Sequence, residues 1–65
     1  MSPAADLLPI TLEDEIACVK RELALRERVY PRQVSAGRLR QTAADRELAL
    51  MQAVLRTLLT LRGAT

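Results

Sequence analysis

The chain has 65 residues, 49% of them hydrophobic and 28% charged, with a formal net charge of +2. It has no histidine, one cysteine and one aromatic residue, Tyr30. These numbers exclude a second domain and an internal disulfide, and they argue against a zinc site, a base-stacking platform and histidine-based catalysis. We therefore expect one small, non-enzymatic domain without a metal ion or a cofactor.

Residues 1–10 are predicted to form a flexible leader, because Pro3 and Pro9 interrupt any regular pattern. Its start lacks basic residues and Asp6 breaks its apolar stretch, so we expect no secretory signal. No apolar run approaches the roughly 18–20 residues that span a bilayer. The unpaired Cys18 is typical of a reducing compartment. The sequence thus predicts a cytoplasmic protein that makes no use of a membrane.

A first helix is predicted over residues 12–29, with Thr11 and Asp14 suited to form a capping box at its start. Apolar residues recur on its main face at helical spacing, and a weaker apolar strip lies about 120° away. The main face consists of Leu12, Ile16, Val19, Leu23 and Tyr30. The weaker strip consists of Cys18, Leu25 and Val29.

Residues 30–40 are predicted to form a bend. Pro31 lacks a backbone N–H and its ring clashes with the preceding turn, so we expect it to end or kink the first helix. Gly37 is suited to the left-handed backbone conformation that ends many helices, which we call a left-handed stop. From Arg26 to Arg46, six arginines stand against two acidic residues, a local balance of +4. Basic character therefore concentrates around the middle of the chain.

A second helix is predicted over residues 41–62, with Gly63 as its terminator. It carries two apolar seams, which together cover a sector of roughly 180° instead of the roughly 100° that one partner requires. The first seam consists of Ala44, Leu48, Met51, Leu55 and Leu58. The second consists of Ala43, Leu50, Val54 and Leu61. The excess apolar surface predicts a second partner, most simply another copy of the chain.

The predicted fold is an all-α antiparallel helical hairpin that dimerises into a four-helix bundle. Oligomerisation is the stabilising device that remains for a chain of this length without disulfides or metals. We expect the dimer interface to be apolar and drawn from both helices. Its predicted residues are Cys18, Leu25, Val29, Leu48, Met51, Leu55, Leu58 and Leu59.

The bend also carries the residues most suited to bind another molecule. Tyr and Arg are frequent anchors of protein interfaces, and Arg pairs bidentately with carboxylates and phosphates. The candidate partner-binding residues are Tyr30, Arg32, Gln33, Arg38 and Arg40. An equally weighted alternative is that Tyr30 covers the end of the hairpin core and the arginines are only solvated.

Several strings of the chain resemble a group of short phage and prophage proteins. They are Ile16-Ala17-Cys18-Val19-Lys20-Arg21-Glu22, Arg28-Val29-Tyr30-Pro31-Arg32, Gly37-Arg38-Leu39 and Ala44-Asp45 before a Leu/Met/Ala/Val-rich helix. Many members of that group carry Ser or Thr after the Gly-basic-apolar triplet, where Arg40 stands here. By class-level analogy, the resemblance implies a non-enzymatic protein that binds and antagonises a host protein in the host cytoplasm, such as a transcription regulator, a motility or pilus motor, or a defence factor. The alternative is a small dimeric nucleic-acid-binding accessory protein, which the mild net charge disfavours.

Overall fold

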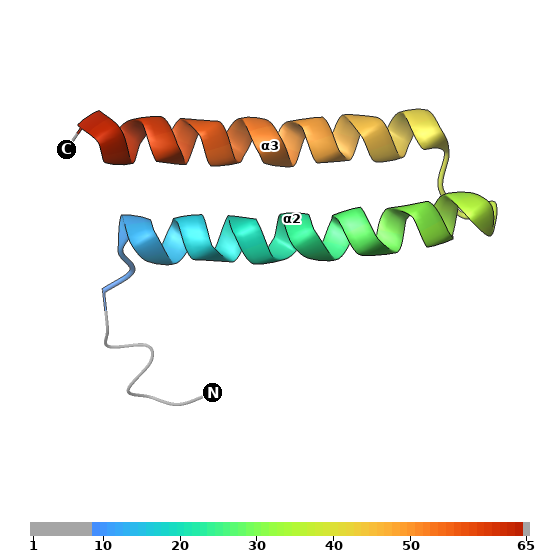
Figure 1. Cartoon of the computed structure of the whole chain (residues 1–65), viewed down its shortest axis with the longest axis horizontal. Helices are drawn as coiled ribbons and strands as arrows, with labels where there is room; N and C mark the ends of the chain where they lie inside the picture. Colours follow the sequence, from blue (N-terminus) through green and yellow to red (C-terminus); the bar gives the residue numbers. More distant parts are fainter. Residues whose placement is uncertain (1–8, 65) are drawn as a thin grey trace.

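Two long α-helices joined by a short connection make up the structure, a computed structural model that describes residues 9–64. Helix α2 spans Leu12–Ser35 and helix α3 spans Gln41–Ala64, 24 residues each. The helices run antiparallel side by side, so that the end of α3 lies beside the start of α2 (Figure 1). This arrangement confirms the predicted helical hairpin. The predicted leader falls almost entirely outside the described residues.

The start of α2 is fixed by the capping box that the sequence predicts. The Thr11 hydroxyl accepts a hydrogen bond from the Asp14 backbone N–H at 3.1 Å, and the Asp14 carboxylate accepts one from the Thr11 backbone N–H at 3.0 Å. Two backbone donors that the first helical turn leaves without partners are thereby satisfied. The first turn also contains Glu13 and Glu15, and their negative charges interact favourably with the positive end of the helix dipole.

The end of α2 differs from the prediction. The helix does not end near Val29 but continues through Pro31 to Ser35, which shortens the predicted bend of residues 30–40. Pro31 removes only one intrahelical hydrogen bond, whose acceptor is the carbonyl of the exposed Glu27, where water can replace the donor. Val34 is half-buried and falls on the same face as Ile16, 18 residues earlier, so continued packing favours helix beyond the proline.

Helix α2 ends instead at Gly37, whose φ is +74°. The Arg38 N–H donates to the Gln33 carbonyl at 2.9 Å, and the Gly37 N–H donates to the Val34 carbonyl at 3.0 Å. These two bonds form a Schellman motif, which satisfies carbonyls at the helix end and needs a left-handed residue next to the last turn. Gly37 supplies it, as the sequence predicts.

Helix α3 begins at Gln41, as predicted, where the Gln41 side-chain amide donates to Asp45 at 2.9 Å. Thr42 therefore lies inside the first turn of the helix. The helix continues to Ala64, two residues beyond the predicted end, so Gly63 is helical and does not terminate it. A glycine without a positive φ weakens a helix by about 1 kcal/mol relative to alanine but does not by itself stop it.

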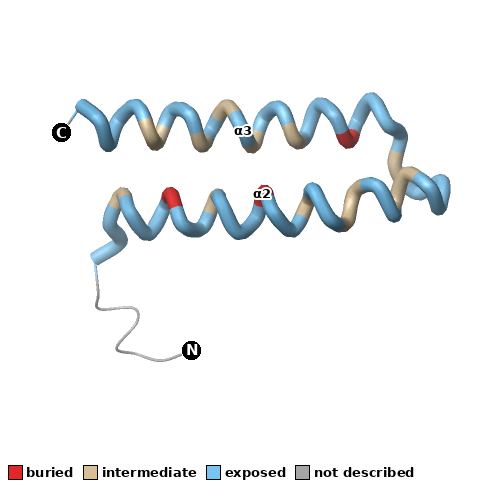
Figure 2. The backbone as a smooth tube through the Cα atoms, viewed as in Figure 1, coloured by how far each residue is buried: buried red, intermediate tan, exposed pale blue. Residues whose placement is uncertain are grey.

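The core lies along the line where the two helices meet. Only Ile16, Leu23 and Ala44 are buried among residues 9–64. The buried positions of each helix face the other helix (Figure 2). At the open end of the hairpin, Arg62 lies 3.5 Å from Glu13 across the two helices. Both side chains are well exposed, so this ion pair adds little to stability.

Candidate functional site

The two apolar seams of α3 have different surroundings. The first seam is used for packing within the chain: Ala44 is buried, and Leu48, Met51, Leu55 and Leu58 are half-buried. This side of α3 faces α2 (Figure 2). The predicted interface residues on this seam therefore already have a partner inside the hairpin. Leu59 is half-buried beside them.

The second seam of α3 stays open to solvent. The side chains of Leu50, Val54 and Leu61 are 43%, 47% and 52% exposed, and Ala43 is also exposed. Because these residues recur seven, four and seven positions apart, they form one stripe along the helix. We call it the α3 stripe. The sequence predicts this seam, but none of its residues is among the predicted dimer-interface residues.

A shallow groove of about 620 Å³ lies beside the α3 stripe, between the first half of α2 and the second half of α3. Val54 belongs to both the stripe and the groove. The residues that line the groove are Ile10, Asp14, Glu15, Cys18, Val19, Val54 and Leu58. Stripe and groove share Val54 and together form a largely apolar face, which includes side chains from both helices and the carboxylates of Asp14 and Glu15. We call it the apolar face.

The residues of the weaker strip of α2 differ in burial. Cys18 is exposed and lines the groove, so it belongs to the apolar face. Val29 is half-buried. Leu25 is exposed and lies nine residues, or about 180°, from Ile16, so it points away from α3. It is seven residues, or about 20°, from Cys18, so both residues lie on the side of α2 that borders the groove.

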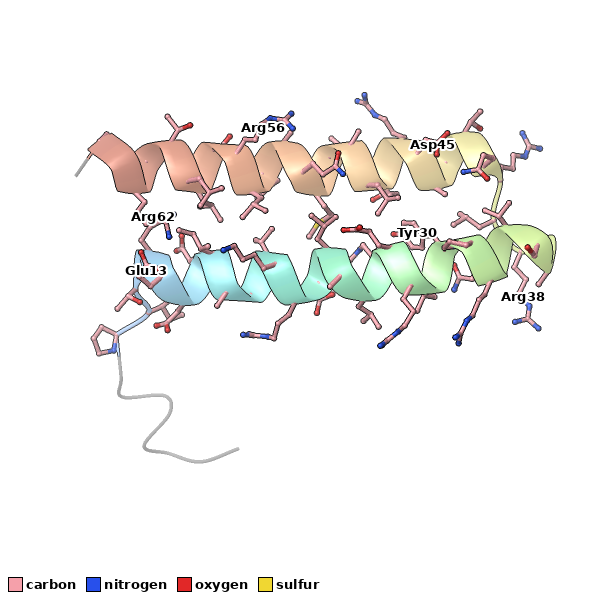
Figure 3. All side chains as sticks on the ribbon, viewed as in Figure 1. Glu13, Tyr30, Arg38, Asp45, Arg56 and Arg62 are labelled. Carbon is pink, nitrogen blue, oxygen red and sulfur yellow. The ribbon has the colours of Figure 1, made fainter. Side chains whose placement is uncertain are left out.

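The candidate partner-binding residues do not form one patch. Tyr30 and Arg32 are both helical, and two residues along a helix place them about 200° apart. Tyr30 is half-buried and lies on the side of α2 that faces α3, whereas Arg32 is exposed (Figure 3). Gln33 is half-buried in the last turn of α2. The grouping in sequence depended on a break at Pro31 that does not occur.

Tyr30 also has an interaction within its own helix. The Glu22 carboxylate, 2.6 Å from the Arg26 guanidinium, raises the pKa of Arg26 above its ordinary value, and the Tyr30 side chain adds to this shift. Tyr30 is thus engaged with Arg26 and packed toward α3. This environment fits the alternative in which Tyr30 covers the end of the hairpin core.

The connection presents its arginines to solvent. Arg38 and Arg40 are exposed, and the Arg38 side chain points away from both helices (Figure 3). Their backbones are fixed, because the Arg38 N–H closes the end of α2 and the Arg40 carbonyl accepts from Ala44 at the start of α3. Both side chains therefore extend into solvent from a connection whose backbone is fixed by hydrogen bonds.

Neither a metal-ligand cluster nor a membrane-spanning helix is found among the described residues. Residues 9–64 contain no group of three or more His, Cys, Asp or Glu side chains placed to hold a metal ion. None of the helices in this part of the chain has the length and hydropathy needed to cross a membrane. The main features of the described residues are therefore two kinds of surface: the apolar face and a set of exposed arginines.

Comparison with protein-family models, curated proteins and solved structures finds no significant match to this chain. The function of the hairpin is therefore inferred from its surfaces.

Proposed function

We propose that this chain is a homodimeric, non-catalytic protein-binding module that binds and antagonises a host protein in the host cytoplasm. The observation that carries the proposal is the unpartnered apolar face formed by the α3 stripe and the groove. The resemblance to short phage proteins supports the host-protein part of the proposal.

A hairpin with three buried residues among those described is poorly stabilised by itself. Domains of this size leave much of their apolar surface in water and commonly need disulfides, metals or a second subunit. The single Cys18 cannot form a disulfide within the chain. A second copy is the simplest source of the missing apolar contacts.

The apolar face has the form that a two-fold dimer needs. A two-fold interface uses the same patch on both subunits, and here a ridge, the α3 stripe, lies beside a groove. The ridge of each copy would pack against the groove of the other, and the four helices would form a bundle. Both seams of α3 would then be covered, one inside the hairpin and one between subunits.

The free energies of burial and association indicate which residues the dimer must bury. Burying the exposed half of Leu50, Val54 and Leu61 gains about 1 kcal/mol each, or roughly 6 kcal/mol per dimer. Association costs on the order of 4–15 kcal/mol in lost freedom of motion. The gain from the stripe lies near the lower end of this cost, so a stable dimer also needs groove residues such as Cys18 and Val19 to lose their contact with water.

Val54→Glu tests the dimer, because it places a charge at the residue shared by stripe and groove. We expect the unchanged chain to sediment as a dimer and Val54→Glu to sediment as a monomer with reduced helix content. Ala49→Glu is the matched control, since Ala49 is exposed on α3 about 140° from Ala44, away from both α2 and the stripe. A monomeric, fully folded wild-type chain at micromolar concentration would contradict the proposal.

A further inference from the structure

A row of arginines lies on the outer side of α2. Arg21, Arg28 and Arg32 are exposed, and their spacing of seven and four residues places them within about 40° of one another on the helix. This side is turned away from α3 and borders the groove, because Arg21 is seven residues, or about 20°, from Asp14 in the groove lining. We call these three residues the arginine row.

The arginine row has no acidic partner among residues 9–64. The nearby acidic groups are engaged elsewhere, Glu22 with Arg26 at 2.6 Å and Asp14 in the capping box. Arg28 and Arg32 are four residues apart, and like charges at this spacing destabilise a helix by about 0.2–0.5 kcal/mol. A bound carboxylate would remove this repulsion.

Leu25 lies in the middle of the arginine row and is 42% exposed. It is four residues after Arg21 and three before Arg28, so all three side chains share one side of the helix. An apolar anchor bordered by arginines is typical of protein interfaces. Nucleic-acid backbones offer no apolar contact for Leu25, and no aromatic residue is present on this side for stacking.

We propose that the outer side of α2 binds an acidic, amphipathic segment of the host protein. Carboxylates of that segment pair with the arginine row, and one of its apolar side chains packs on Leu25. This inference rests on the proposed protein-binding function and specifies the chemistry of the partner. None of the three arginines lines the groove that the proposed dimer would bury.

The test uses the full chain and a fluorescently labelled helical peptide about five turns long, with leucines along one side and glutamates flanking them. Binding is followed by fluorescence anisotropy, and a second peptide carries glutamine at every glutamate. We expect the glutamate peptide to bind about tenfold or more tightly than the glutamine peptide, and its affinity to fall with added salt.

Two pairs of matched variants locate the surface. Arg28→Gln/Arg32→Gln removes two charges from the arginine row, and Arg46→Gln/Arg56→Gln removes two exposed charges from α3, where Arg56 points away from α2 (Figure 3). We expect the first pair to weaken peptide binding about tenfold and the second to leave it unchanged. Leu25→Ala should also weaken binding, since the apolar anchor is lost.

Two results would overturn the inference: equal binding of both peptides, or equal loss in both pairs of variants. Tighter binding to random-sequence duplex DNA than to the glutamate peptide, abolished by Arg28→Gln/Arg32→Gln, would assign the row to nucleic acid instead. Sedimentation of the same samples separates this inference from the dimer. A dimer that ignores the acidic peptide contradicts only the arginine row, and a folded monomer contradicts the proposed function.

Discussion

At the scale of single residues, the clearest agreement between sequence and structure is the start of α2. Thr11 and Asp14 exchange two hydrogen bonds over a separation of three residues. Such a local motif depends on little outside its own turn, which is why the sequence predicts it correctly. Its energetic contribution can be measured in the intact chain.

Thr11→Ala removes the hydroxyl that accepts from the Asp14 backbone N–H. Loss of a threonine cap costs about 1 kcal/mol, so the free energy of unfolding should fall by that amount in urea titrations. Thr60→Ala is the control, because Thr60 is exposed within α3 and alanine is the better helix former. An equal loss of stability in both variants would show that the cap is not the cause.

The Asp14 carboxylate should make folding depend on acid pH. Hydrogen bonds from Thr11, mainly from its backbone N–H, hold the pKa of Asp14 below its ordinary value of 3.8. A lowered pKa in the folded state stabilises the fold above that ordinary value, and this contribution is lost as the pH falls through the folded pKa. NMR titration of the Asp14 carboxyl should give a midpoint below 3.8. In Asp14→Asn, the drop in unfolding free energy below pH 4 should be smaller than in the unchanged chain.

At the scale of the elements, the sequence predicts two helices and their starts correctly but places the first bend too early. The prediction begins the bend next to Pro31, although it is Gly37 that provides the positive φ that closes the helix. A proline removes one hydrogen bond. Val34, which follows Pro31 in the chain, is still half-buried on the same face of the helix as Ile16. The rule for proline is local, and packing across the hairpin outweighs it.

The two glycines should respond oppositely to alanine. Gly37→Ala places a Cβ at φ +74°, which costs about 1–2 kcal/mol for an L-residue even though no atom lies within 4 Å of that Cβ. Gly63→Ala sits in helical backbone with open space around the new Cβ, so it should stabilise α3 by about 0.5–1 kcal/mol. Thermal unfolding by circular dichroism compares the two; a lower midpoint for Gly63→Ala would contradict its helical placement.

At the scale of the whole molecule, the apolar face left exposed by the hairpin is the feature that should control stability and association. The hairpin leaves Leu50, Val54 and Leu61 in water beside a groove of about 620 Å³. If a second copy covers this face, folding and association are coupled, and the stability of the protein depends on its concentration.

The thermal midpoint of the unchanged chain should therefore rise with protein concentration, by several degrees over a hundredfold range. Circular dichroism melts across such a dilution series measure it directly. Val54→Glu should lack this dependence, because it does not associate. A midpoint that stays constant for the unchanged chain would indicate that each hairpin folds by itself.

The sequence by itself determined the features that depend on neighbours in the chain: the helical periodicity, the capping box at Thr11 and the left-handed stop at Gly37. Only the tertiary structure decided which seam of α3 faces α2, since both seams have helical spacing and periodicity gives no direction in space. It also decided that Tyr30 and Arg32 lie on different sides of α2, because a helix that passes Pro31 rotates them about 200° apart. Packing between the helices, which links residues distant in the chain, is the physical reason for both.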